Sequence, residues 1–102
     1  MNNPSNFNPP EFNSNLQNLI EDGATLLDVR GKEEFASFNL KGSINIPLDD
    51  LEDDLSKLEN KKYIIVYCNT GENSAKAKEL LNSLGIKSVI TGGSYSDVEK
   101  YF

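Results

Sequence analysis

The chain has no histidine and only one cysteine, Cys68, among its 102 residues. Zinc sites are built mostly from histidine and cysteine, so a zinc centre would lack its usual ligands. One cysteine cannot form a disulfide within the chain, and nothing therefore points to an oxidising compartment. We expect no metal and no cofactor.

Long apolar runs and basic charge are also scarce. No segment approaches the ~18 apolar residues that a membrane-spanning helix requires, and the opening MNNPSNFNPP lacks the basic and apolar regions of a secretory signal. Nine lysines and one arginine oppose 16 acidic residues, which gives a formal net charge of −6. These features favour a cytoplasmic protein that binds neither nucleic acid nor an anionic membrane.

What the chain does contain fits one domain. Its length is near the common size of a single domain, and 37% hydrophobic residues are enough for one modest core. Residues 1–10 are rich in asparagine and proline and hold too little apolar surface to offset the entropy of ordering. We predict a flexible N-terminal arm over 1–12 and a folded domain over 13–102.

Apolar periodicity predicts strands that alternate with helices. The clearest strand is YIIVY at 63–67. Alternation at these intervals predicts an α/β fold, with a small parallel β-sheet flanked by helices on both faces. The expected strands are 25–29, 43–46, 63–67 and 88–90, and the expected helices are 13–21, a brief one within 31–42, 48–58, 74–84 and a tail that follows a turn at Gly92 and Gly93.

The segment LDDLEDDLSKL, residues 48–58, combines a leucine stripe with a run of acidic residues. Its four leucines recur at helical spacing, and five of the other seven residues are acidic. The pattern predicts a surface helix whose acidic side faces solvent. An acidic docking face for a basic partner is the alternative interpretation.

The lone cysteine lies where the clearest strand ends and a helix follows. In parallel α/β sheets, ligands bind beyond the carboxyl ends of the strands, where loops lead into helix N-termini. Successive N–H groups after Cys68 can converge on an anion, and the thiolate is the nucleophilic form of cysteine. A small buried hydrophobe is the competing interpretation of this residue. The loop comprises Asn69, Thr70, Gly71, Glu72, Asn73 and Ser74.

Several motifs together resemble the single-domain members of the rhodanese-like family, over most of residues 14–102. The resemblance rests on the order and spacing of the whole set rather than on one motif. The motifs are LLDVR at 26–30, Glu34-Phe35, LKGSINIP at 40–47, VYCNTGENSA at 66–75, LGI at 84–86 and Gly92-Gly93.

The resemblance implies a three-layer rhodanese-like fold and a sulfurtransferase activity. In that family a cysteine takes sulfane sulfur from a donor such as thiosulfate, becomes a persulfide, and passes the sulfur to cyanide or another thiophilic acceptor. By position Cys68 is that nucleophile, and residues 69–74 form the loop that binds the donor. Because the chain has no second cysteine, the sulfur must pass to an outside thiol, to cyanide or to a sulfur-relay protein. We expect the protein to act as a monomer.

The loop departs from the family pattern at Asn73, where an arginine is usual. Loss of a charged donor that faces an anion costs about 1.5 to 3 kcal/mol, so we expect weak use of thiosulfate. Glu72 makes an anionic donor still less welcome. Milder departures, Phe38-Asn39 for Gly-His and Lys41 for proline, we interpret as structural.

Asp28, Arg30 and Glu34 are expected near the same end of the sheet as Cys68. We interpret them as structural support, with Arg30 bonded to Glu34 or to another neighbouring carboxylate. A direct role for Arg30, the only arginine, in binding an anion is the alternative.

Two other functions compete with sulfur transfer. A binding or regulatory module with little turnover is favoured by Asn73 and disfavoured by the intact cysteine. A phosphatase or arsenate reductase would need a longer loop that ends in arginine.

Overall fold

The computed structural model describes residues 12–102, so the predicted N-terminal arm lies outside the described residues except for Phe12, which begins the first helix. No helix over this range is both long and apolar enough to cross a membrane. In chain order the elements are α1 (Phe12–Glu21), β2 (Thr25–Asp28), α2 (Lys32–Ser37), β3 (Ile44–Asn45), the 3₁₀ helices η1 (Leu48–Asp50) and η2 (Leu55–Leu58), β4 (Ile64–Cys68), α3 (Glu72–Ser83), β5 (Val89–Ser94) and α4 (Tyr95–Glu99).

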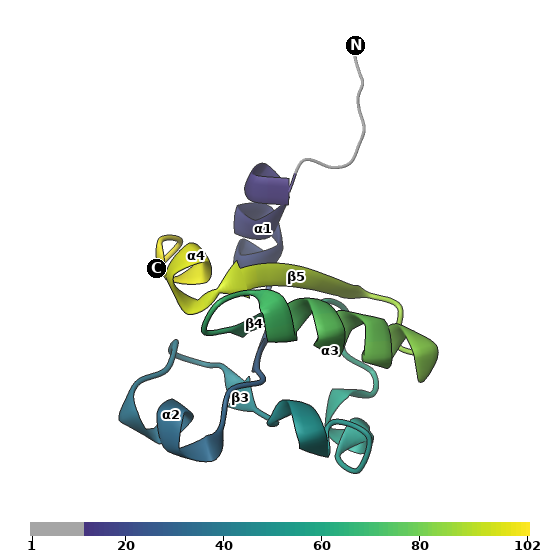
Figure 1. The fold of residues 1–102 in the computed structure, drawn as a ribbon. Coiled ribbons are helices and arrows are strands. Elements are labelled where there is room, and N and C mark those ends of the chain that lie inside the picture. Colours follow the sequence, from purple (N-terminus) through teal and green to yellow (C-terminus); the bar gives the residue numbers. More distant parts are fainter. Residues whose placement is uncertain (1–11) are drawn as a thin grey trace.

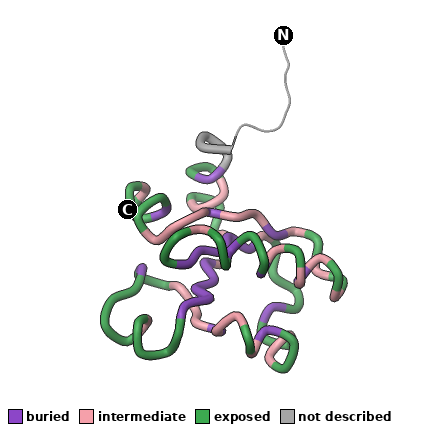
Figure 2. Tube along the Cα trace, in the orientation of Figure 1, coloured by how far each residue is buried: buried purple, intermediate pink, exposed green. Residues whose placement is uncertain are grey.

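The four described strands form one parallel sheet in the order β3-β2-β4-β5 (Figure 1). β4 lies inside the sheet, where Val66 pairs with Leu27 of β2 and with Thr91 of β5. Every residue of β4 is buried, as a continuous run of β-branched and aromatic residues predicts for a strand covered on both faces (Figure 2). The predicted parallel α/β sheet is confirmed.

Helices cover both faces of the sheet. Alternate side chains of β4 point to opposite faces, so that Val66 packs into one core and Tyr67 into the other. The Val66 face packs against the 3₁₀ segments and α3, which contribute Leu51, Leu58, Ala77 and Leu81. The Tyr67 face packs against α1 and α4, which contribute Leu16 and Val98. This is the three-layer arrangement that the resemblance implied.

The prediction of an α-helix over 48–58 is wrong, but the predicted leucine stripe does pack against the core. Two short 3₁₀ helices and a turn replace one regular α-helix. Leu51 and Leu58 are fully buried, and Leu48 and Leu55 pack against them at partly buried positions. Aspartate is a weak helix former, and closely spaced like charges repel, so burial of the leucines fixes this segment without a continuous helix.

The predicted turn at Gly92-Gly93 is also wrong, because both glycines lie within β5. The register shifts by one residue here, since Val66 pairs with Thr91 and Tyr67 with Gly93, which leaves Gly92 as the extra residue of a β-bulge. A Cβ at Gly92 would lie 2.5 Å from Val98 Cγ2. The glycine therefore permits close packing of α4 on the sheet and does not reverse the chain.

The fold brings three strand ends to one edge of the sheet. Asp28, Cys68 and Ser94 are the last residues of β2, β4 and β5, and Cys68 pairs with Ser94. Each strand is parallel to its neighbour, so these carboxyl ends share the edge at which α/β proteins bind ligands.

Candidate active site

Cys68 ends β4 with its thiol turned toward the start of α3. The residue is 2% exposed. Its Sγ accepts hydrogen bonds from the backbone N–H groups of Gly71, at 3.0 Å, and Ser74, at 3.3 Å. On the other side the carbonyl oxygen of Gly93 lies 4.0 Å away. Two amides of the predicted loop thus converge on the sulfur, which gives a sulfur anion the hydrogen-bond donors it needs.

Local backbone geometry explains how the loop reaches the sulfur. Gly71 has φ 95°, a left-handed conformation that favours glycine, and a Cβ there would contact the backbone of Gly93 at 3.6 Å. The Ser74 hydroxyl donates to the Gly71 carbonyl at 2.8 Å and fixes the turn from the helix side. α3 begins at Glu72, two residues earlier than predicted, so the N-terminal end of the helix lies directly beside the thiol.

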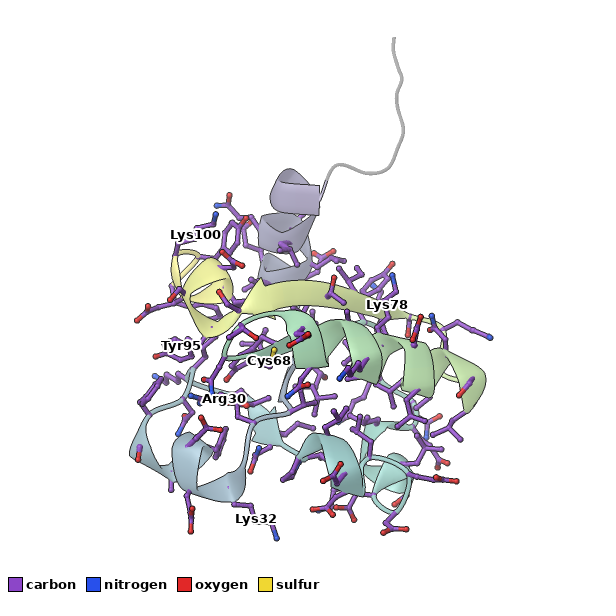
Figure 3. The ribbon with its side chains drawn as sticks, viewed as in Figure 1. Arg30, Lys32, Cys68, Lys78, Tyr95 and Lys100 are labelled. Atoms are coloured by element: carbon purple, nitrogen blue, oxygen red, sulfur yellow. The ribbon has the colours of Figure 1, made fainter. Side chains whose placement is uncertain are left out.

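The outer rim of the loop is exposed and carries no cation. Asn69, Thr70, Glu72 and Asn73 all face solvent, whereas Ser74 is fully buried. Figure 3 shows the labelled lysines, Lys32, Lys78 and Lys100, at the periphery and away from the sulfur. The loop therefore presents backbone amides and a carboxylate, without a positive charge, to an incoming molecule.

Arg30 is bound to Asp28 in a buried pair at the end of β2. Its Nε lies 3.0 and 2.9 Å from the two Asp28 oxygens, and its Nη2 donates to Asp28 Oδ2 at 2.7 Å. Nη2 also donates to the Phe38 carbonyl at 2.6 Å. The Asp28 hydrogen bonds are the main cause that raises the pKa of Arg30. Of the carboxylates that the sequence offered to Arg30, the structure thus selects Asp28.

Three aromatic rings surround the Arg30 guanidinium. Its Cζ lies 4.6 Å from the ring centre of Phe38, 5.2 Å from that of Tyr95 and 6.0 Å from that of Tyr67. The buried Nη1 has no hydrogen-bond acceptor, and these ring faces partly offset that cost. Sequence reasoning missed this cluster, although Phe38 lies at a position that departs from the family pattern. The Arg30 side chain thus holds together the segments that carry Phe38, Tyr67 and Tyr95.

Glu34 lies across the loop from α3 and contacts the residue that follows the cysteine. Its Oε2 accepts a hydrogen bond from Asn69 Nδ2, and its Oε1 accepts one from the Gly31 N–H at 3.2 Å. The Asn69 amide is the main cause that lowers the pKa of the Glu34 carboxyl, and the Gly31 N–H and the Arg30 charge lower that pKa further. Sequence reasoning placed Glu34 nearby but missed this partner, because no local pattern links residues 35 positions apart.

No group of three or more cysteine or acidic side chains within 12–102 is placed to hold a metal ion. The groups described at this edge are one sulfur, the two amides that donate to it and the carboxylates around them. A model of the rhodanese-like domain matches residues 12–100 of the chain. The protein belongs to the rhodanese-like family.

Relatives within this family agree with the assignment. The chain is 32% identical over 74 residues to the thiosulfate sulfurtransferase PspE of Escherichia coli, covering 71% of each chain. It is 33% identical over 86 residues to a human thiosulfate:glutathione sulfurtransferase, covering 69% of this chain and 74% of the relative. The solved structure of the human single-domain sulfurtransferase TSTD1 superposes with a TM-score of 0.72 at 27% identity, covering 85% of this chain and 91% of that one.

Proposed function

We propose that the protein is a sulfurtransferase that carries sulfane sulfur as a persulfide on Cys68. The observation that carries the proposal is the convergence of the Gly71 and Ser74 amides on the only sulfhydryl of the chain, at the carboxyl edge of a parallel sheet. A hydrogen-bonded sulfur anion at that place is suited to nucleophilic attack. The rhodanese-like relatives named as sulfurtransferases support the same chemistry.

The reaction divides into two displacements at sulfur. The Cys68 thiolate attacks the outer sulfur of a donor R–S–S⁻ or of thiosulfate, a new S–S bond forms, and the old S–S bond breaks. Its electron pair leaves with the thiolate RS⁻ or with sulfite, and Cys68 retains a persulfide anion. An acceptor thiolate or cyanide then attacks the outer sulfur, and Cys68 leaves as the thiolate. Oxidation states balance within each exchange, so no external oxidant or reductant is needed.

The donor proposed from the loop is a persulfide rather than thiosulfate. Asn73 is exposed in the first turn of α3 and supplies no positive charge, while Glu72 beside it is acidic. A dianionic donor such as thiosulfate therefore brings both its charges close to a carboxylate at the rim, whereas a low-molecular-weight or protein persulfide brings a single negative charge at its reacting end. Because two relatives are named for thiosulfate, assays of a persulfide donor should include thiosulfate for comparison.

The acceptor must come from outside the chain, because no second cysteine is present to take the sulfur. A small thiol, cyanide or a sulfur-relay protein meets this requirement. One relative, from Bacillus subtilis, is named a putative sulfur carrier protein and is 30% identical over 70 residues, which supports a relay partner. We place the protein in the cytoplasm as a monomer that requires neither nucleic acid nor a membrane.

Intact-mass spectrometry tests the proposal directly. The protein is incubated with thiosulfate or with glutathione persulfide, freed of donor, and measured before and after addition of cyanide. We expect a gain of one sulfur atom that cyanide removes, with no gain in Cys68→Ser. If neither donor loads the folded protein, or if Cys68→Ser gains the same mass, the assignment of Cys68 as carrier is refuted.

A binding or regulatory module is the second candidate, and the absence of a loop arginine at Asn73 favours it. The same loading experiment separates the two functions. A module need not accept sulfur on Cys68, whereas a sulfurtransferase must both accept and release it.

A further inference from the structure

We propose that Glu34 is a positioning residue that holds the Cys68 loop in shape through Asn69. The inference rests on the proposed role of Cys68 and extends it to a side chain of α2 that does not touch the sulfur. It concerns how the hydrogen bonds to the sulfur are maintained, and not which molecule delivers the sulfur.

A hydrogen bond within the loop fixes its conformation on the α3 side only. On the α3 side the Ser74 hydroxyl is bonded to the Gly71 carbonyl, and both residues donate their N–H groups to Sγ. On the opposite side Asn69 and Thr70 are exposed. The bond from Asn69 to Glu34 joins that exposed side to the body of the protein.

Glu34 is itself held in place by α2. One carboxylate oxygen accepts the Gly31 N–H at the start of this helix, which leaves the other oxygen for Asn69. α2 buries none of its own residues, so hydrogen bonds fix its position. At its far end the Phe38 carbonyl accepts from Arg30, which is bound to Asp28.

A continuous set of contacts therefore connects two strand ends. It runs from Asp28 at the end of β2 through Arg30 and α2 to Glu34, and from there through Asn69 to Cys68 at the end of β4. Loss of the Glu34 contact frees one side of the loop while leaving the strands in place. The Gly71 and Ser74 amides then spend less time aligned on the sulfur, so the thiolate becomes less favoured.

The test measures alkylation of Cys68 by iodoacetamide as a function of pH. The midpoint of the profile reports how strongly the thiolate is favoured, and the plateau at high pH reports access to the sulfur. Because Glu34 is also a negative charge, Glu34→Ala is compared with Glu34→Gln. The glutamine removes the same charge and gives up the acceptor for Gly31, but its one oxygen can still accept from Asn69. Asn69→Ala is compared with the parent, since both proteins retain the negative charge of Glu34.

We expect the midpoint to lie about 0.3 to 1 pH unit higher in Glu34→Ala than in Glu34→Gln, the range that loss of one hydrogen bond gives. The midpoint for Asn69→Ala should lie above that of the parent by a similar amount. Combining Glu34→Ala with Asn69→Ala should add little, because either change removes the same contact. Glu33→Gln, at the exposed neighbouring position of α2, is the matched control and should not couple to Asn69→Ala.

Equal midpoints in Glu34→Ala and Glu34→Gln, or fully additive shifts in the double variant, would overturn the proposal. A raised plateau with an unchanged midpoint would overturn it too, because the contact would then restrict access instead of aligning amides. Alkylation requires no sulfur donor, so this result is independent of whether Cys68 loads sulfur. A failure here is thus distinguishable from a failure of the proposed function.

Discussion

At the scale of single residues, the site depends on which hydrogen bonds surround the sulfur. The amide donors come from the backbone. Ser74 bonds to the Gly71 carbonyl on one side of the loop, and Asn69 bonds to Glu34 on the other. Positive charge is the feature that this loop lacks. We therefore expect a substitution at the exposed Asn73 to change the choice of donor.

Asn73→Arg should lower the apparent KM for thiosulfate about 10-fold or more. A guanidinium at the first turn of α3 adds charged donors for the anion, which are worth about 1.5 to 3 kcal/mol. Steady-state kinetics with thiosulfate and cyanide measure the change, and the neutral Asn73→Gln serves as the control. An unchanged KM in Asn73→Arg would show that position 73 does not face the donor.

A second prediction concerns Tyr67 and the pH dependence of the free energy of unfolding. Burial is the main cause that raises the pKa of its hydroxyl from 10.0 to about 12. In the unfolded chain this hydroxyl ionises near pH 10, so the folded protein loses free energy of unfolding as the pH rises from about 10 to 12. Near pH 8 the hydroxyl remains neutral and accepts the Leu40 N–H at 3.4 Å.

Tyr67→Phe should therefore be less stable than the parent at pH 8, by about 1 to 3 kcal/mol, because the Leu40 N–H loses its acceptor. The difference should narrow at pH 11, because phenylalanine cannot ionise. Urea denaturation at both pH values measures it, and the other tyrosines and the lysines are common to both proteins. A difference that stays constant between pH 8 and pH 11 would contradict this account.

At the scale of elements, apolar pattern predicted most of the fold and failed where glycine or acidic residues compete with it. The run at 63–67 gave β4 within one residue, and the helix expected at 74–84 is present as α3. Gly92-Gly93 looks like a turn in isolation, and only the approach of Val98 reveals the need for glycine within a strand. In the site, the position of Cys68 followed from strand order, whereas the Glu34 to Asn69 contact depends on tertiary packing that no local pattern contains.

Gly92→Ala should destabilise the protein by about 1 to 3 kcal/mol. The added Cβ would lie 2.5 Å from Val98 Cγ2 and 3.0 Å from Ile65 Cγ2, so α4 or the sheet must shift. Gly31→Ala is the matched control, because its Cβ would meet only Glu34 Oε1 at 3.8 Å. Urea denaturation measures both free energies of unfolding, and equal values for the two variants would contradict the packing described for the bulge.

At the scale of the whole molecule, we propose a monomer on two grounds, the acidic net charge and the few large apolar side chains that are exposed among the described residues. The formal net charge is −6. Among the described residues, Phe38 and Phe102 are the large apolar side chains that are exposed, at 50% and 60%. An obligate dimer usually buries a much larger apolar surface than two separate phenylalanines provide.

Sedimentation equilibrium should accordingly give a mass close to 11.3 kDa at micromolar concentration. Self-repulsion between acidic chains weakens with salt, so the measurement is made at low and high ionic strength. A mass near twice this value at low salt, where repulsion is strongest, would contradict a monomer.

The burial of Cys68 places the same geometric demand on both halves of a transfer cycle. A donor must bring its outer sulfur to a residue that is 2% exposed, and this requirement favours a sulfur that projects from the rest of the donor. Once loaded, the transferable atom sits one S–S bond, about 2.0 Å, farther out on the side from which it arrived. A cysteine on the surface of another protein that can collect sulfur from Cys68 can therefore also deliver it, because both transfers pass through the same arrangement of three sulfur atoms.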